Sequence, residues 1–167
     1  VEPESIMTGK TGEPEVVDLR EAFVLPGLID AHVHLTFEHD ADARMRRVTE
    51  DEAAAALRGS VYARRTLEAG ITTVRDLGGG AAVFALRDAI AQGRIPGPRM
   101  LVAGHAITPT GGHGDRTNGY REDLFDEPGA YLGVADGPYE ARKAVRAQVK
   151  RGADLIKLTA TGGVLSN

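Results

Sequence analysis

The chain has 167 residues, enough for one domain with a hydrophobic core, and 20 basic against 24 acidic residues give a net charge of −4. The basic residues are scattered and few aromatic residues accompany them, which excludes a nucleic-acid-binding surface, and no apolar run approaches the roughly 20 residues of a membrane helix. The absence of cysteine excludes disulfides and thiolate metal sites and fits a cytoplasmic protein.

The first segment, residues 1–22, is rich in polar residues and contains glycine and proline. Stretches 15–19 and 23–25 are candidate strands, too few for a stable sheet of their own. We expect residues 1–24 to be the tail of a β structure whose beginning is absent, and residues 25–167 to form the second unit.

A strand with two histidines follows, in the sequence Leu-Pro-Gly-Leu-Ile-Asp-Ala-His-Val-His-Leu of residues 25–35. Side chains alternate between the two faces of a strand, so Asp30, His32 and His34 are predicted to share one face. The other face, formed by Ile29, Ala31, Val33 and Leu35, is apolar and is expected to pack against a core. The histidine pair, His32 and His34, is either hydrogen-bonded on the strand or binds one metal ion, because neutral imidazole suits zinc and related divalent ions.

Helical and extended segments alternate after this strand. Residues 36–48 read as a charged loop, and Thr49 with Glu52 forms a capping box for a helix that ends at Gly70. The later segments are, in order, a strand 71–77, a glycine turn 78–80, a helix 81–92, a strand 100–107, a long loop 108–136, a helix 138–151 and a strand 155–159. This order predicts parallel strands, in half of an eight-stranded barrel or in an open sheet.

Both arrangements place functional loops at the carboxyl ends of the strands, where the histidine pair, the loop 111–115 and Lys157 all fall. Lys157 is costly to bury unless it is paired or neutralised. It either forms a salt bridge with Asp30 or Asp76, or reacts as a neutral amine with carbon dioxide. The resulting carbamate would bridge two metal ions.

Two further histidines are candidates for substrate contacts. His113 lies among the glycines of loop 111–115, and it is either a substrate ligand or a solvated loop residue. His105 is predicted inside the third strand, as a buried core residue or a substrate contact. The glycine turn 78–80 lacks the spacing of a phosphate-binding loop, which argues against a nucleotide-binding open sheet.

Several of these motifs together resemble the amidohydrolase superfamily. The segment 25–34 is similar to its first-strand metal motif, and the resemblance continues through residues 72–79, 97–99, 110–115 and 152–157. The last two segments, with residues 162–166, are similar to the imidazolonepropionase-like branch. That branch includes metal-dependent Xaa-Pro dipeptidases and N-acyl-amino-acid hydrolases.

The resemblance implies an α/β fold, the first half of a (β/α)8 TIM-type barrel preceded by a remnant of a small β-sandwich domain in residues 1–24. It implies two divalent metal ions, expected to be zinc, with His32 and His34 as ligands. Lys157, as a carboxylated lysine, would bridge the ions and take part in catalysis. A metal-bridging hydroxide would cleave an amide bond of a dipeptide or an N-acyl amino acid, with His113 against the substrate.

The family's other metal-ligand histidines and its general-base aspartate belong to later strands. The chain is therefore expected to be a truncated first half that lacks a complete active site. A cyclic-amide hydrolase of the imidazolonepropionase type and a non-catalytic barrel fragment remain as alternatives. The expected partner is a small-molecule amide or dipeptide substrate. A homo-oligomer is compatible with the sequence.

Overall fold

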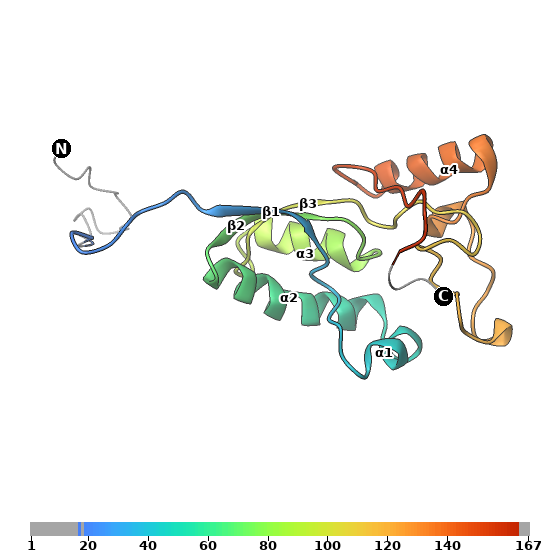
Figure 1. The fold of residues 1–167 in the computed structure, drawn as a ribbon, viewed down its shortest axis with the longest axis horizontal. Coiled ribbons are helices and arrows are strands. Elements are labelled where there is room, and N and C mark those ends of the chain that lie inside the picture. Colours follow the sequence, from blue (N-terminus) through green and yellow to red (C-terminus); the bar gives the residue numbers. More distant parts are fainter. Residues whose placement is uncertain (1–16, 18, 164–167) are drawn as a thin grey trace.

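The computed structural model describes residue 17 and residues 19–163 (Figure 1). The elements are β1 (Leu28–Val33), α1 (Ala43–Thr49), α2 (Glu52–Glu68), β2 (Ile71–Asp76), α3 (Ala82–Ala91), β3 (Arg99–Val102), the short 3-10 helices η1 (Glu122–Leu124) and η2 (Ala130–Leu132), and α4 (Gly137–Lys150). The strand predicted at 15–19 lies largely outside the described residues, and residues 23–25 lead into β1 without forming a strand. No helix within the described residues has the length and apolar character needed to cross a membrane.

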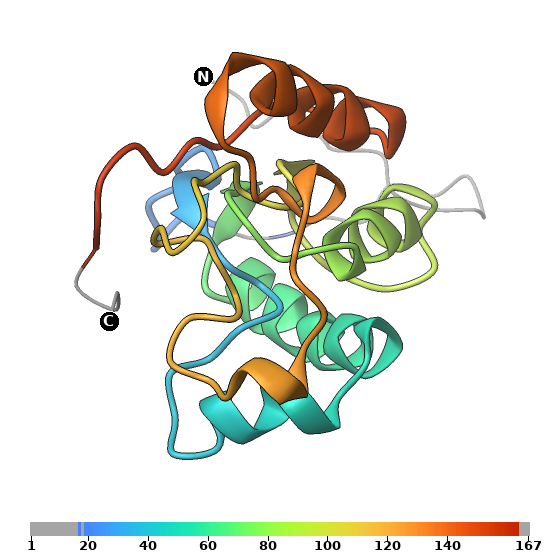
Figure 2. The same ribbon diagram turned by 90° about the vertical axis from the view of Figure 1, so that its right-hand side faces the viewer.

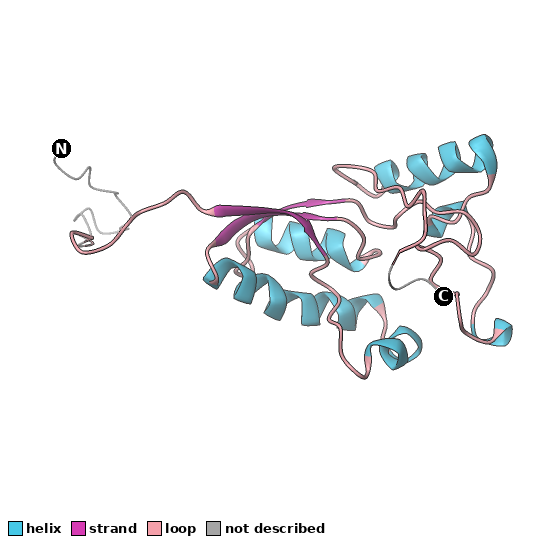
Figure 3. Ribbon diagram, viewed as in Figure 1, coloured by secondary structure: helices cyan, strands magenta, loops and turns pink. Residues whose placement is uncertain are grey.

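The three strands form one parallel sheet in the order β1-β2-β3. Helices α2 and α3 lie side by side along one face of this sheet, and α4 lies beyond its end (Figures 1 and 3). The predicted mixed α/β class with parallel strands is thereby confirmed, while the half barrel and the sandwich remnant stay predictions.

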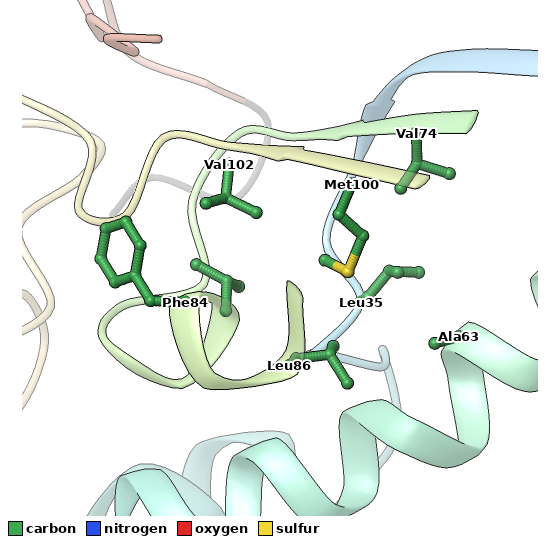
Figure 4. Packing of buried hydrophobic residues seen from close by; sticks show 8 residues of the cluster. Leu35, Ala63, Val74, Phe84, Leu86, Met100 and Val102 are labelled. Carbon is green, nitrogen blue, oxygen red and sulfur yellow. The ribbon is translucent and has the colours of Figure 1, made fainter. Parts of the chain in front are cut away.

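The core lies between the sheet and the two helices (Figure 4). Val74 of β2 and Val102 of β3 are fully buried, whereas Leu101 between Met100 and Val102 is 43 % exposed. This alternation follows from the two faces of a strand, only one of which is covered by helices. Burial of each large side chain in this layer contributes about 1.5–3 kcal/mol to the free energy of unfolding. Leu86 of α3 is one of these buried side chains and packs α3 against the sheet.

The segment 36–48 was predicted as a loop, but it contains most of helix α1. The predicted capping box is also wrong. Thr49 ends α1, and its hydroxyl donates to the Met45 carbonyl at 3.1 Å, so it does not cap the next helix. Asp51 is the N-cap of α2, and its carboxylate accepts the Ala54 N–H at 2.8 Å.

Glu52 serves the neighbouring helix instead of its own. Its carboxylate accepts the Ala82 N–H at 2.7 Å, at the start of α3, where the N-cap Ala81 has no side-chain acceptor to offer. The turn before α3 is the predicted glycine turn, in which Gly80 has a φ of 67°. The carboxylate of Glu52 packs against Gly80, so α2 and α3 are joined at this end.

The strand predicted at 155–159 is reduced to a single parallel bridge between Ile107 and Leu158. The Ile107 N–H donates to the Lys157 carbonyl at 2.8 Å, and the Thr159 N–H donates to the Ile107 carbonyl at 2.9 Å. The ladder does not extend because β3 ends at Val102 and the chain turns at Gly104, which has a φ of 72°. The predicted strand 100–107 is therefore also too long.

Candidate functional site

Strand β1 carries one extra residue between Asp30 and Val33. Asp30 pairs with Val74 and Val33 pairs with Asp76, so β1 advances by three residues while β2 advances by two. In a regular ladder His32 would stand beside Asp76, on the buried face of β2. The β-bulge gives that place to Val33, which packs against the core, and leaves His32 exposed.

Side chains satisfy the backbone groups of this bulge. The His32 N–H donates to Asp30 Oδ1 at 3.0 Å, and Arg75 Nε donates to the Ala31 carbonyl at 2.8 Å. The predicted alternation is corrected in two respects. The Asp30 carboxylate folds back onto the backbone instead of joining the histidines, and Ile29 is 73 % exposed instead of packing beside Val33.

The two imidazoles of the histidine pair are neighbours. Their ring centroids lie 5.4 Å apart, with the planes at 69°. His34 Nδ1 lies 3.2 Å from the Gly78 carbonyl oxygen. Because a carbonyl oxygen only accepts, Nδ1 carries the proton of this hydrogen bond, and Nε2 keeps the lone pair that a metal ion would bind.

Lys157 lies close enough to His32 for its charge to affect the pKa of that imidazole. Burial, followed by the positive charges of Lys157, His34 and Arg75, lowers the pKa of His32 below its ordinary value, and Asp30 opposes this effect. The neutral imidazole that metal binding requires is thereby favoured. Within the described residues Lys157 forms no ion pair, so the alternative of a salt bridge with Asp30 or Asp76 is not realised.

The side chains that meet here fit part of a metal site. Two neighbouring imidazoles are suitable zinc ligands, and a lysine becomes an anionic oxygen ligand once it carries a carbamate. A structural or catalytic zinc ion needs at least three protein ligands. Among the described residues, no three or more His, Cys, Asp or Glu side chains are disposed to hold an ion.

His105 lies in the turn after β3 and has different neighbours from the histidine pair. Its N–H donates to Gln148 Oε1 at 3.1 Å, and the fully buried Gln148 donates from Nε2 to the Tyr131 carbonyl at 3.3 Å. Burial, assisted by Arg151 and Arg116, lowers the pKa of His105 to about 4. The His105 imidazole is therefore neutral at pH 7.

This lowered pKa predicts a loss of stability in acid. The His105 pKa is 6.5 in the unfolded chain and about 4 in the folded one, so the unfolded state binds more protons between these values. The contribution is complete above pH 6.5 and is lost as the pH falls through about 4, up to about 3 kcal/mol in total. His105→Gln should lose less free energy of unfolding between neutral pH and about pH 4.5 than the wild type in urea titrations.

His39 supplies the matched control for this measurement. It is exposed, and its ring packs edge-on against Phe37 with 4.7 Å between the centroids. His39→Gln should keep the acid sensitivity of the wild type. Equal acid sensitivity in the wild type and in His105→Gln would contradict the assignment.

His113 occupies the long loop that the sequence predicted as functional. Its ring packs against the backbone of Gly163. The same loop lines a partly open pocket of about 350 Å³, and the lining includes Asp115, Tyr120 and Phe125. The loop also reaches α1, where the Tyr120 hydroxyl donates to the Arg44 carbonyl at 3.0 Å (Figure 2).

Comparisons with known proteins agree on one relationship. The sequence model of the Amidohydrolase family matches residues 23–167. The curated ochratoxinase of Aspergillus niger is 37 % identical over 161 residues, which cover 88 % of this chain and 33 % of the relative.

Solved structures give the same result. A Xaa-Pro dipeptidase with methionine bound in its active site is 45 % identical, with a TM-score of 0.78, over 84 % of this chain and 35 % of that one. A prolidase complexed with N-methylphosphonate-L-proline is 32 % identical, with a TM-score of 0.71, over 99 % and 42 %. The chain thus spans between 33 % and 42 % of the lengths of these relatives.

Proposed function

The chain belongs to the amidohydrolase family, and on that premise we propose that the protein is a metal-dependent hydrolase of the amide bond of a dipeptide or an N-acyl amino acid. The observation that carries the proposal is the histidine pair, exposed at the end of a parallel strand with its rings 5.4 Å apart. The similarity to a Xaa-Pro dipeptidase, a prolidase and an ochratoxinase supports amide-bond hydrolysis as the class of reaction.

In this proposal His32 and His34 hold one divalent ion, expected to be zinc, through neutral imidazoles. The hydrogen bond from His34 Nδ1 to the Gly78 carbonyl orients that ring and leaves Nε2 free. Lys157, next to His32, contributes as a carbamate: its neutral amine adds to carbon dioxide, a C–N bond forms and one proton is released. When bound, the ions supply a nucleophile at neutral pH and polarise the amide carbonyl.

Substrate contacts are proposed for His113 and His105. The loop of His113 lies over the end of the segment that holds Lys157, because a Cβ at Gly114 would lie 3.4 Å from Thr159 Oγ1. His105 is neutral at pH 7 and offers a hydrogen-bonding imidazole without a charge. Both assignments stay predictions.

The test is metal analysis together with a substrate panel. The full-length protein would be expressed with zinc and bicarbonate, and its metal content would be measured by mass spectrometry. The panel would contain Xaa-Pro dipeptides, N-acyl amino acids and lactams. We expect up to two ions per chain and cleavage of a dipeptide or an N-acyl amino acid that a chelator abolishes. Absence of metal after reconstitution would reject the proposal, and cleavage of lactams alone would favour the cyclic-amide alternative.

A further inference from the structure

Asp76, the last residue of β2, is a fully buried carboxylate. Its Oδ2 accepts the Leu35 N–H at 2.8 Å, and its Oδ1 accepts the Gly78 N–H at 3.1 Å. Within the described chain it forms no ion pair. Burial raises its pKa, while the two backbone donors and the charges of the histidine pair oppose that rise. Burying a carboxylate without a cation costs several kcal/mol, so a purely apolar side chain would serve packing better.

The two N–H groups that Asp76 accepts belong to residues that are themselves linked to His34. Leu35 follows His34 directly in the chain, at the point where β1 ends. Gly78 is the residue whose carbonyl lies 3.2 Å from His34 Nδ1. His34, Gly78, Asp76 and Leu35 therefore form a closed circuit of hydrogen bonds and covalent bonds.

We infer that Asp76 is a positioning residue for His34, which fixes the Nδ1–H tautomer of the imidazole and directs Nε2 to a divalent metal ion. The inference rests on the proposed function, because it assigns a role toward the ion that the histidine pair would hold. A histidine ligand is oriented by the hydrogen bond of its other ring nitrogen. Asp76 supports that bond from one step further away, since it anchors both the peptide that carries His34 and the turn that accepts from it.

Asp76→Asn is the test variant. The amide keeps the volume of the side chain and one acceptor oxygen, but its NH2 group faces a backbone N–H donor in place of the second oxygen. We expect the dissociation constant for zinc to rise ten- to a hundredfold, as for other groups that support a metal ligand. It would be measured by competition with a chromophoric chelator.

Asp154→Asn is the matched control. Asp154 Oδ2 accepts the Val102 N–H of β3 at 2.9 Å and Arg87 Nη1 at 2.9 Å, so it also anchors strand backbone. Its partners do not include either residue of the histidine pair. The zinc dissociation constant of Asp154→Asn should stay within about twofold of the wild-type value. Zinc binding is weakened only by loss of a group that supports a metal ligand. A rise equal to that of Asp76→Asn would reduce the role of Asp76 to general folding and overturn the inference.

A second measurement needs no variant. Nitrogen-15 NMR of the metal-free wild-type protein reports which ring nitrogen of His34 carries the proton. The inference requires Nδ1–H for His34, and Asp76→Asn should show a mixture of the two tautomers. The Nε2–H tautomer in the wild type would overturn the inference even where the variant does not fold.

These outcomes also separate the inference from the proposed function. Wild-type protein that binds zinc as tightly as Asp76→Asn leaves the hydrolase proposal intact and rejects the role of Asp76. Wild-type protein that binds no zinc rejects both. Weaker zinc binding in Asp76→Asn alone, together with the Nδ1–H tautomer in the wild type, supports both.

Discussion

Replacing Lys157 with alanine is expected to abolish binding of a second metal ion and to lower amide hydrolysis by more than about a hundredfold, beyond the loss caused by a supporting group. The reason is that the methyl group of alanine cannot form a carbamate, so the bridging anionic oxygens are lost. Metal stoichiometry by mass spectrometry and turnover of the substrate found in the panel would measure the effect.

Lys143→Ala is the control for this prediction. Lys143 lies on the exposed side of α4, so its removal takes away a lysine without touching the site. It should keep the metal content, the activity and the dependence on bicarbonate of the wild type. Full activity and two ions in Lys157→Ala would rule out the carbamate.

Gly133→Ala is expected to destabilise the protein by about 3 kcal/mol, the sum of a backbone penalty of about 1 kcal/mol and a clash of about 2 kcal/mol. Gly133 has a φ of 92°, and a Cβ there would overlap the Ala106 carbonyl, which is backbone and cannot swing away. The Gly133 carbonyl accepts the Thr108 N–H at 3.0 Å, so the clash would also separate the loop from the chain after β3. Urea unfolding monitored by circular dichroism would measure the change.

Gly137→Ala separates the two causes. Gly137 has a similar φ of 83°, but a Cβ there would meet nothing within 4 Å. It should therefore cost only the backbone penalty of about 1 kcal/mol. Equal losses in the two variants would show that the close approach to Ala106 contributes nothing to stability.

Much of the fold could be predicted because local signals and tertiary packing agree. The β-branched run of β2, the glycines that end α2 and α3, and Pro138 in the first turn of α4 each determine a local conformation that the core then uses. Local signals failed where two acceptors compete. Thr49 and Glu52 have the spacing of a capping box, yet Asp51 caps α2 because Thr49 is already inside α1.

The candidate site divides in the same way. His32, His34 and Lys157 could be proposed from sequence because each lies at the end of an extended segment in a β-α pattern. The role of Asp76 could not, because its bond to Leu35 joins residues 41 positions apart. The link from Gln148 to His105 spans 43 positions and likewise depends on how α4 packs. An aspartate two residues before a glycine turn was the available signal for Asp76.

The exposure of His32 depends on the bulge in β1, because the bulge sets which β1 residue pairs with each residue of β2. With regular pairing to β2, the present sequence would place the His32 imidazole in the buried position beside Asp76 that Val33 now occupies. The sequence His-Val-His alone is therefore not sufficient to place a histidine pair in this way in another protein. A designer who grafts it into another parallel sheet must also transfer Asp30 and a cross-strand arginine like Arg75, which hold the extra residue in place.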